Sequence, residues 1–302
     1  MGYGSWSSDD YVSYATSTGR STSKTYVTNA TTGVTTEHTI LSSSYGAQDI
    51  FKARGLDPLL DPKNVHRECN DSEEHPNTVP VILALDVTGS MGSAAAEVAK
   101  KLNVVMSQLY SQIKDVEFMV MAIGDLDYDR APIQISQFEA DVRVAKWVDK
   151  IYFEHGGGGN LFESYTAVWY MGLYHMMLDS WKRGKKGIMI TIGDEPLNPY
   201  LPKAELARVT GDNLQADVET DALYSKASER FDIYHLAVDD AATAYERYVS
   251  DIQSSWGKLL DSEHFRVVTM NDLIPQIVDI VSNAAGTNDN MEFVHAGKEI
   301  AW

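Results

Sequence analysis

The strongest chemical signal in the sequence is a set of oxygen-bearing side chains at alternate positions, Asp86, Thr88 and Ser90. They place one carboxylate and two hydroxyl groups close together, and Gly89 and Gly92 allow the backbone to turn tightly around them. Hard oxygen donors of this kind are the ligands that Mg²⁺ and Mn²⁺ prefer. The spacing therefore predicts a divalent-cation site. The alternative is that Thr88 and Ser90 only cap a following helix.

Such a site needs a rigid element that ends at Asp86, and the apolar run from Val81 to Leu85 provides one. An apolar run without polar alternation predicts a central parallel strand that is buried on both faces. In open parallel sheets, ligands bind beyond the carboxyl ends of strands where the strand order reverses. Asp194 also stands at the end of an apolar strand, at residues 187–192, which makes it a second candidate.

The rest of the chain supplies the strands and helices of such a sheet. Further buried strands are predicted at 116–123, 233–238 and 265–269, and an alternating edge strand at 133–138. Helices are predicted at 48–60, 93–114, 142–151, 162–181, 203–210, 216–230, 242–260 and 271–283. The predicted fold class is α/β, with a doubly wound, mostly parallel six-stranded sheet and helices on both faces.

These motifs resemble the metal-ion-dependent adhesion site of von Willebrand factor type A (VWA) domains, which begins Asp-x-Ser-x-Ser. Thr88 replaces the middle Ser and keeps the hydroxyl, and Asp194 matches the family's Asp after the fourth strand. The Thr that the family supplies from a glycine-rich loop is missing, because its place falls on Gly159. The resemblance covers about residues 78 to 285. It implies a VWA or Rossmann-like fold and Mg²⁺ or Mn²⁺ held by Asp86, Thr88, Ser90 and Asp194, with Asn160 or Glu163 in place of the missing Thr.

A closer likeness is to the VWA domains attached to alpha-kinases. Those domains share the Asp-x-Thr-Gly-Ser-Met start at residues 86–91 and an Asp after the second strand, here Asp125. They also share a glycine loop with a downstream Glu, here Gly156 to Glu163, and an Asp-x-Pro turn, here residues 194–196. Kinase chemistry is not implied, because no kinase domain accompanies these motifs.

Composition narrows the partners and the compartment. The 302 residues include 25 Lys and Arg against 43 Asp and Glu, which gives a net charge of -18 and disfavours nucleic acid and membrane as partners. The single cysteine, Cys69, allows no intramolecular disulfide and no multi-cysteine metal site. The first residues show no signal peptide, and no apolar stretch approaches the length of a membrane span. We therefore expect a cytoplasmic protein.

Four regions are expected along the chain. Residues 1–45 are rich in Ser, Thr and Tyr and are predicted to form a flexible arm, because they hold few apolar residues to bury. The alternative for the region of Val27, Val34 and Ile40 is a small hairpin. Residues 46–77 are predicted to be a polar linker with a short helix, residues 78–286 the VWA-like domain, and residues 287–302 a C-terminal tail.

Three functions remain open at this stage. The first is a non-enzymatic binding module or adaptor whose metal takes a carboxylate from a partner protein; intracellular VWA proteins often act in assemblies that include AAA-type ATPases. The second is a structural subunit of a phage or bacterial assembly whose arm contacts neighbouring subunits. The third is a metal-dependent hydrolase that uses the two strand-end carboxylates; it needs a general base, and a lone His155 beside the glycine loop is more typical of a satisfied or solvent-facing residue. The third lacks a nucleophile motif, and we predict that the protein is not an enzyme.

Overall fold

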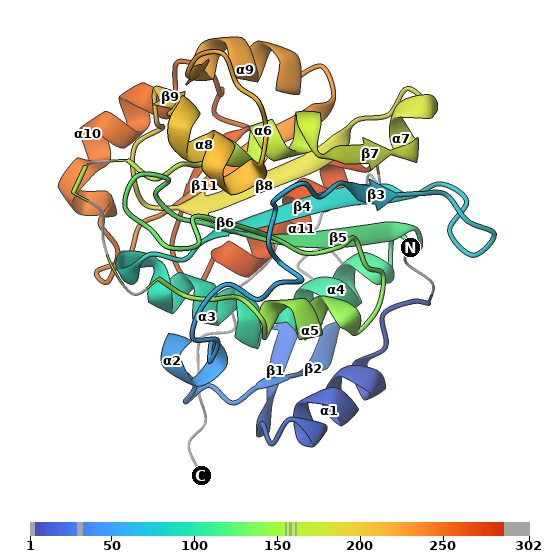
Figure 1. Ribbon diagram of the computed structural model, residues 1–302. Helices are drawn as coiled ribbons and strands as arrows, with labels where there is room; N and C mark the ends of the chain where they lie inside the picture. The colour runs from blue at the N-terminus through green and yellow to red at the C-terminus, as the bar shows by residue number, and fades with distance from the viewer. Residues whose placement is uncertain (1–3, 29–32, 155, 157–158, 161, 287–302) are drawn as a thin grey trace.

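The computed structural model describes residues 4–28, 33–154, 156, 159–160 and 162–286, and a six-stranded sheet lies at its centre (Figure 1). The strand order is β12-β11-β8-β4-β5-β6, and the pairs are parallel except that β6 runs antiparallel to β5. The predicted doubly wound, mostly parallel sheet is therefore confirmed. Its strands are β4 (Val79–Asp86), β5 (Val116–Ile123), β6 (Ile133–Ile135), β8 (Gly187–Gly193), β11 (Phe231–Val238) and β12 (Phe265–Val268).

Helices cover both faces of the sheet because its central strands present apolar side chains to each side. Along β4, Val81, Leu83 and Leu85 enter one hydrophobic core, whereas Ile82 and Ala84 enter the other. The first core is covered by α3 (Gly92–Lys100), α4 (Leu102–Tyr110), α5 (Arg143–Val148) and α11 (Leu273–Ala284). The second is covered by α6 (Ala167–Tyr174), α8 (Lys203–Thr210), α9 (Thr220–Ala227) and α10 (Tyr245–Trp256) (Figure 1).

The connections place a topological switch point beside β4. The chain leaves β4 through α3 and α4 to reach β5 on one side, and it later enters β8 on the other side of β4. The carboxyl ends of these three neighbouring strands therefore meet at one edge of the sheet, where open α/β folds bind ligands. None of the helices in the described ranges is long and apolar enough to cross a membrane.

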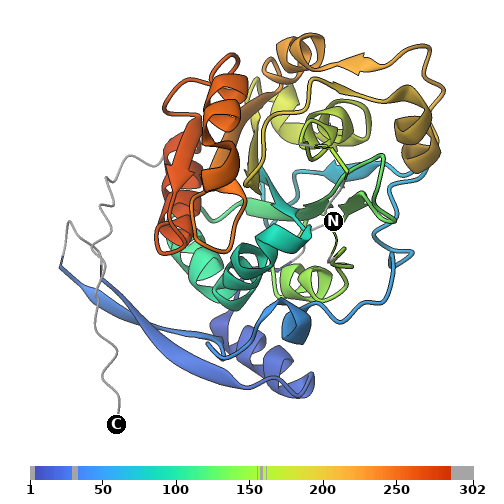
Figure 2. The same ribbon diagram turned by 90° about the vertical axis from the view of Figure 1, so that its left-hand side faces the viewer.

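The N-terminal segment differs from the flexible arm that its composition predicts. It forms α1 (Ser8–Ser17) and an antiparallel hairpin of β1 (Thr22–Thr28) and β2 (Thr35–Leu41). Two of its aromatic side chains are buried: Trp6 is 9% exposed and donates from Nε1 to Asn103 Oδ1 at 2.8 Å, and Tyr11 is 2% exposed. The prediction failed because it counted apolar residues and did not weigh how much area two aromatic rings bury. The hairpin itself projects from the body (Figure 2).

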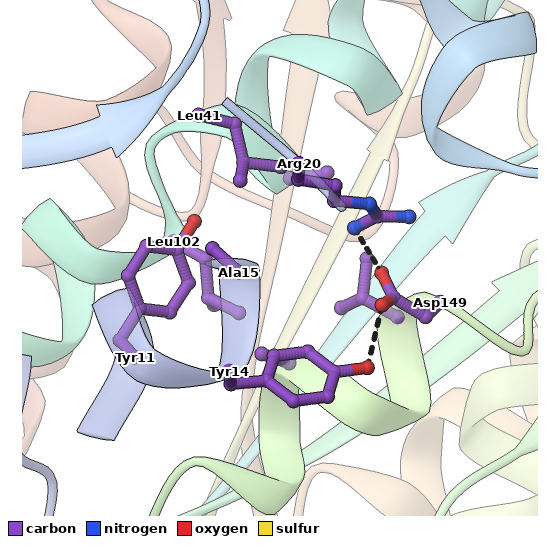
Figure 3. A pocket seen from close by; sticks show the side chains of 10 residues that line it. Tyr11, Tyr14, Ala15, Arg20, Leu41, Leu102 and Asp149 are labelled. Atoms are coloured by element: carbon purple, nitrogen blue, oxygen red, sulfur yellow. Dashed lines mark hydrogen bonds and ion pairs between the residues drawn. The ribbon is translucent and has the colours of Figure 1, made fainter. Parts of the chain in front are cut away.

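Polar contacts also fasten α1 to α5. Tyr14 Oη donates to Asp149 Oδ2 at 2.6 Å, and Arg20 forms an ion pair with the same carboxylate (Figure 3). Arg20 additionally donates from Nη2 to the carbonyl oxygen of Ile50 at 2.9 Å. Helix α1 is therefore part of the folded body.

A short pair of parallel strands links the stretch 46–77 to the region that was predicted as a helix at 162–181. The helix expected at 48–60 is confined to α2 (Ala47–Ile50), and β3 (Arg67–Cys69) pairs with β7 (Met176–Leu178). This pairing interrupts the predicted long helix, so that α6 ends at Tyr174 and a short α7 (Asp179–Lys182) follows. The remaining short elements are the 3₁₀ turn η1 (Gly89–Met91), β9 (Tyr200–Leu201) and β10 (Val218–Glu219).

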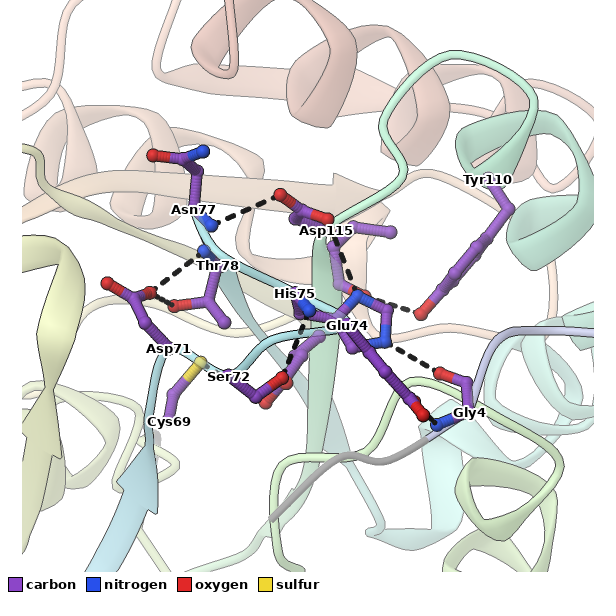
Figure 4. A network of polar contacts seen from close by, with 12 residues as sticks. Gly4, Cys69, Asp71, Ser72, Glu74, His75, Asn77, Thr78, Tyr110 and Asp115 are labelled. Carbon is purple, nitrogen blue, oxygen red and sulfur yellow. Dashed lines mark hydrogen bonds and ion pairs between the residues drawn. The ribbon is translucent and has the colours of Figure 1, made fainter.

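The loop before β4 is ordered by a polar network, although its acidic run predicts a solvated loop (Figure 4). His75 Nε2 lies 2.7 Å from the carbonyl oxygen of Gly4, and His75 Nδ1 lies 3.5 Å from Asp115 Oδ1. The Gly4 N–H in turn donates to Glu74 Oε2 at 3.0 Å. The network ties the N-terminus to the loop and gives His75 a structural role.

Candidate metal centre

Asp86 ends β4 and lies fully buried at the switch point. Its Oδ1 accepts two hydrogen bonds from Thr88, one from the backbone N–H at 2.9 Å and one from Oγ1 at 2.6 Å. Its Oδ2 accepts one from Tyr165 Oη at 2.7 Å. A carboxylate offers about four lone-pair positions. One position on Asp86 Oδ2 therefore remains open.

Asp194 follows β8 and is the second buried carboxylate at this edge. The β4 and β8 pairing places Leu85 opposite Ile192, so the two strand ends lie side by side. Asp194 Oδ2 accepts the N–H of Ala244, whereas Oδ1 is buried and has no hydrogen-bond partner in the described part of the chain. Buried carboxylate oxygens are normally paired, so this unsatisfied oxygen is the feature that a bound cation would explain.

Burial raises the proton affinity of the carboxylates at this edge, and for three of them a neighbouring carboxylate adds to the effect. Burial, followed by the charge of Asp194, raises the pKa of Asp86 to about 8. Burial, followed by the charge of Asp86, raises the pKa of Glu163 well above its ordinary value. Burial and then Asp194 raise the pKa of Glu195 to about 7. In the metal-free site, ionising these carboxyl groups is therefore unfavourable, and a cation bound beside them would favour the ionised form.

The hydroxyl groups of the first motif lie against these carboxylates. Thr88 is buried, and its hydroxyl donates to Asp86. The side chain of Ser90 lies near Asp194 and lowers the pKa of that carboxyl, against the larger increase that burial causes. The structure therefore brings together the four predicted ligands, Asp86, Thr88, Ser90 and Asp194. A pure helix-capping role is not seen for Thr88, whose hydroxyl donates to Asp86 instead of accepting from the helix.

The two proposed replacements for the missing Thr occupy different places. Glu163 is buried, the charge of Asp86 adds to the increase that burial causes in its pKa, and its Oε2 has no hydrogen-bond partner within the described ranges. Asn160 lies at the outer side of the cluster, where its amide lowers the pKa of Asp125 against the larger effect of burial. Glu163 therefore lies near Asp86 without forming, together with Asp86 and Asp194, a three-carboxylate group at metal-binding spacing, whereas Asn160 lies beside Asp125.

The glycine loop is anchored at the first motif. The N–H of Gly89 donates to the carbonyl oxygen of Gly156 at 2.8 Å. At Gly159, which takes the place of the family's Thr, an added Cβ would lie 3.0 Å from the ring of Tyr128. Side chains larger than glycine would therefore displace Tyr128. His155, Gly157 and Gly158 lie outside the described residues.

Sequence reasoning missed Tyr165, which joins the two carboxylate-bearing strand ends. Its hydroxyl donates to Asp86 and accepts the N–H of Asp194 at 3.2 Å. Gly193 makes room for it, because a Cβ there would lie 2.2 Å from the Tyr165 oxygen. The sequence signal available was Gly193 directly before Asp194, which indicates a close approach to that strand end.

The donor set suits a hard cation that keeps water ligands. Among the described residues, no three side chains from His, Cys, Asp and Glu converge at metal-binding spacing. A cation site here would combine carboxylates with hydroxyl groups, which Mg²⁺ accepts as ligands. The unsatisfied Asp194 Oδ1 and the open position on Asp86 Oδ2 fit such an ion.

No protein-family model and no curated protein matches the chain. Solved structures similar to it include the pilus adhesin SpaC from Lactobacillus rhamnosus GG in its open conformation, at 12% identity and a TM-score of 0.45, covering 73% of this chain and 31% of that one. The SpRpn10 VWA domain matches at 11% identity and a TM-score of 0.39, covering 66% of this chain and 95% of that one.

The vWF domain of the type V pili tip protein Mfa5 from Porphyromonas gingivalis matches at 12% identity and a TM-score of 0.41, covering 71% of this chain and 97% of that one. This chain therefore spans less than a third of the adhesin but nearly all of the two isolated domains. The likeness to domains attached to alpha-kinases stays a prediction.

Proposed function

We propose that this chain is a protein-binding module that holds Mg²⁺ or Mn²⁺ between Asp86, Thr88, Ser90 and Asp194. The observation that carries the proposal is the buried, unsatisfied Oδ1 of Asp194 beside a second carboxylate whose pKa is raised. A bound divalent cation supplies positive charge there and leaves a coordination position for a carboxylate of a partner protein. Of the two further candidates, Glu163 is the one that lies near Asp86.

In the proposed complex, the chain's own residues do the positioning. Tyr165 and the Thr88 hydroxyl fix the rotation of the Asp86 carboxylate, and Ala244 fixes Asp194. An acidic side chain on the partner matches a cation held by a protein that is otherwise strongly negative. We further propose an adaptor role in the cytoplasm, including assemblies with AAA-type ATPases; the free, buried thiol of Cys69 is compatible with that compartment.

The partner's carboxylate can be replaced by acetate in a direct test. Mn²⁺ bound to the protein enhances the relaxation of solvent water, and acetate that takes a coordination position should lower this enhancement. Methylammonium chloride at equal ionic strength serves as the control. An enhancement that acetate leaves unchanged would contradict carboxylate binding at the metal.

A second candidate function is a structural subunit, and the projecting hairpin favours it. Tyr26 in β1 is 59% exposed and Val34, just before β2, is 60% exposed, so the hairpin offers uncovered apolar groups. Tyr26→Ser should weaken an assembly built on this hairpin, because it changes an exposed ring and leaves the buried Ile40 and Leu41 of β2 in place. The hydrolase alternative needs a general base, and the buried His235 is poorly suited to that role. Its ring stacks on Trp256 with 3.7 Å between the ring centroids, and burial lowers its pKa far below its ordinary value.

A further inference from the structure

Strand β1 of the projecting hairpin has one backbone edge that pairs with no other strand in the described part of the chain, since its sheet contains only β1 and β2. The N–H of Ser42 donates to the carbonyl oxygen of Ser21 at 3.0 Å, and this pair continues the register of the two strands. Backbone groups along a strand point alternately to its two sides, so every second residue after Ser21 faces β2. The residues whose N–H and carbonyl groups point away from β2 are Thr22, Lys24, Tyr26 and Thr28.

The outer edge of β2, in contrast, is covered by α4. Asn103 on α4 donates from Nδ2 to the carbonyl oxygen of Thr39 at 2.8 Å, which occupies an outward-pointing group of β2. The side chains of His38 and Ile40 are buried on the same strand. The hairpin is therefore fixed to the body through β2, and β1 is its exposed edge.

This edge carries little of the protection that exposed strand edges usually have. Proteins block such edges with charged side chains, prolines or bulges. Strand β1 has seven residues in regular pairing, it contains no proline, and its one charged residue, Lys24, already pairs with Glu37 at 2.8 Å. Residues 22–41 contain one Lys and one Glu, so the hairpin is neutral in a chain of net charge -18. Two copies therefore repel each other less at the hairpin than their overall charge suggests.

We propose that two copies of this chain associate by antiparallel pairing of their β1 strands. A twofold axis at Thr25 places Lys24 opposite Tyr26 of the second copy, and Thr22 opposite Thr28 of the second copy. All four outward-pointing residues then form backbone hydrogen bonds across the interface. This pairing goes beyond the metal-binding function, and it gives the structural-subunit candidate a definite partner.

Charge selects this register over its neighbour. The side chains of Lys24 and Tyr26 lie on the same, exposed face of the hairpin. In the proposed register, each ammonium group faces a tyrosine ring of the other copy, which is a favourable contact. A shift by two residues towards the strand start would set the two Lys24 side chains directly opposite each other, and like charges in that position destabilise a sheet. Because the hairpin projects from the body (Figure 2), the two bodies lie at opposite ends of the joined strands.

Sedimentation equilibrium of the full chain tests the pairing. It is measured in a chelator, so that the result does not depend on the metal site. Wild type should show a monomer–dimer equilibrium without larger species, because each hairpin offers one exposed edge. A monomer at every concentration up to about 1 mM would overturn the proposal, and so would an open-ended assembly.

Two substitutions at one position separate backbone pairing from side-chain contact. Tyr26→Ser removes the ring and keeps the N–H, whereas Tyr26→Pro removes both. The N–H faces away from β2, so the proline should not disturb the hairpin, and the two variants should melt at similar temperatures. The proline variant should dimerise about tenfold more weakly than the serine variant, because each copy loses a hydrogen bond. Equal dimerisation of the two variants would overturn pairing through the backbone.

A charge reversal tests the register without altering the backbone. Tyr26→Lys places an ammonium group opposite Lys24 of the second copy and should weaken the dimer about tenfold, since the repulsion occurs twice. Adding Lys24→Glu to this variant should restore most of the affinity. The matched control is Tyr200→Lys, which changes the net charge equally at another exposed tyrosine and should not weaken the dimer. A double variant that dimerises no better than Tyr26→Lys alone would overturn the register.

Discussion

Tyr165 and Asp86 are joined by a buried hydrogen bond of 2.7 Å that links the middle of the chain to the end of the central strand. The same hydroxyl accepts the N–H of Asp194. Tyr165→Phe should lower the free energy of unfolding by about 1–3 kcal/mol, because two buried polar groups lose their partner. Chemical denaturation measures this.

Tyr11→Phe is the matched control for that variant. The Tyr11 hydroxyl is also buried but has no hydrogen-bond partner in the described chain, beside the small cavity under α1 (Figure 3). Removal of this hydroxyl should leave the free energy of unfolding almost unchanged. Equal losses in the two variants would contradict a specific role for the Tyr165 hydroxyl.

Gly193→Ala should disturb the same contact from the other side. The added methyl would lie 2.2 Å from the Tyr165 oxygen, so the ring or the strand must move. Overpacking of this kind costs about 1–3 kcal/mol of folding free energy. At Gly55 a Cβ meets nothing within 4 Å, so Gly55→Ala is the control and should change the melting temperature little. A Gly193 variant as stable as the control would show that the close approach is not constrained.

The metal-free protein should lose stability as the pH rises through the range in which the site titrates. Burial and then Asp194 raise the pKa of Asp86 to about 8, so the folded protein binds this proton more tightly than the unfolded chain does. The contribution is fully present below a pH of about 4 and is lost as the pH approaches 8. Urea unfolding in the presence of a chelator should therefore show the advantage of wild type over Asp86→Asn shrinking with rising pH. A wild-type advantage that grows with rising pH would contradict a raised pKa of Asp86 in the folded protein.

The N-terminal segment should contribute to stability. Trp6→Ala removes a ring that is 9% exposed and its hydrogen bond to Asn103, and should lower the free energy of unfolding by about 3 kcal/mol. Tyr26→Ala changes a ring that is 59% exposed and should have little effect. Melting temperatures of the two variants that agree within the experimental error would contradict the packing of Trp6 and α1 against the body.

The sequence allowed the sheet to be predicted well because buried parallel strands are unbroken apolar runs. The strand at 116–123 was predicted with the bounds that the structure has. The prediction of a continuous helix at 162–181 was wrong, because Met176–Leu178 forms a strand that pairs with β3. This pairing uses backbone groups, which no side-chain pattern reveals. The first motif and Asp194 were found because carboxylates directly follow apolar runs.

Tyr165 and Glu195 could not be assigned in the same way. Tyr165 lies in a stretch rich in aromatic residues, where core packing is the ordinary explanation, and only the close approach at Gly193 shows its contact with Asp86. Glu195 follows Asp194 directly in the sequence, but its raised pKa is caused first by burial and then by Asp194, and the sequence does not show that burial. The Tyr165 contact depends on the placement of residues far apart in the sequence.

The central claim is that Asp86 and Asp194 hold a divalent cation, and titration of Mg²⁺ into the metal-free protein by calorimetry tests it most directly. Wild type should bind one ion, and at 100 times the dissociation constant the ion should add about 2.7 kcal/mol to the free energy of unfolding. Asp86→Ala should fold and lose both effects, whereas Asp251→Ala, which removes an exposed carboxylate on α10, should behave as wild type. Equal Mg²⁺ binding by wild type and Asp86→Ala, or none by wild type, would contradict the claim.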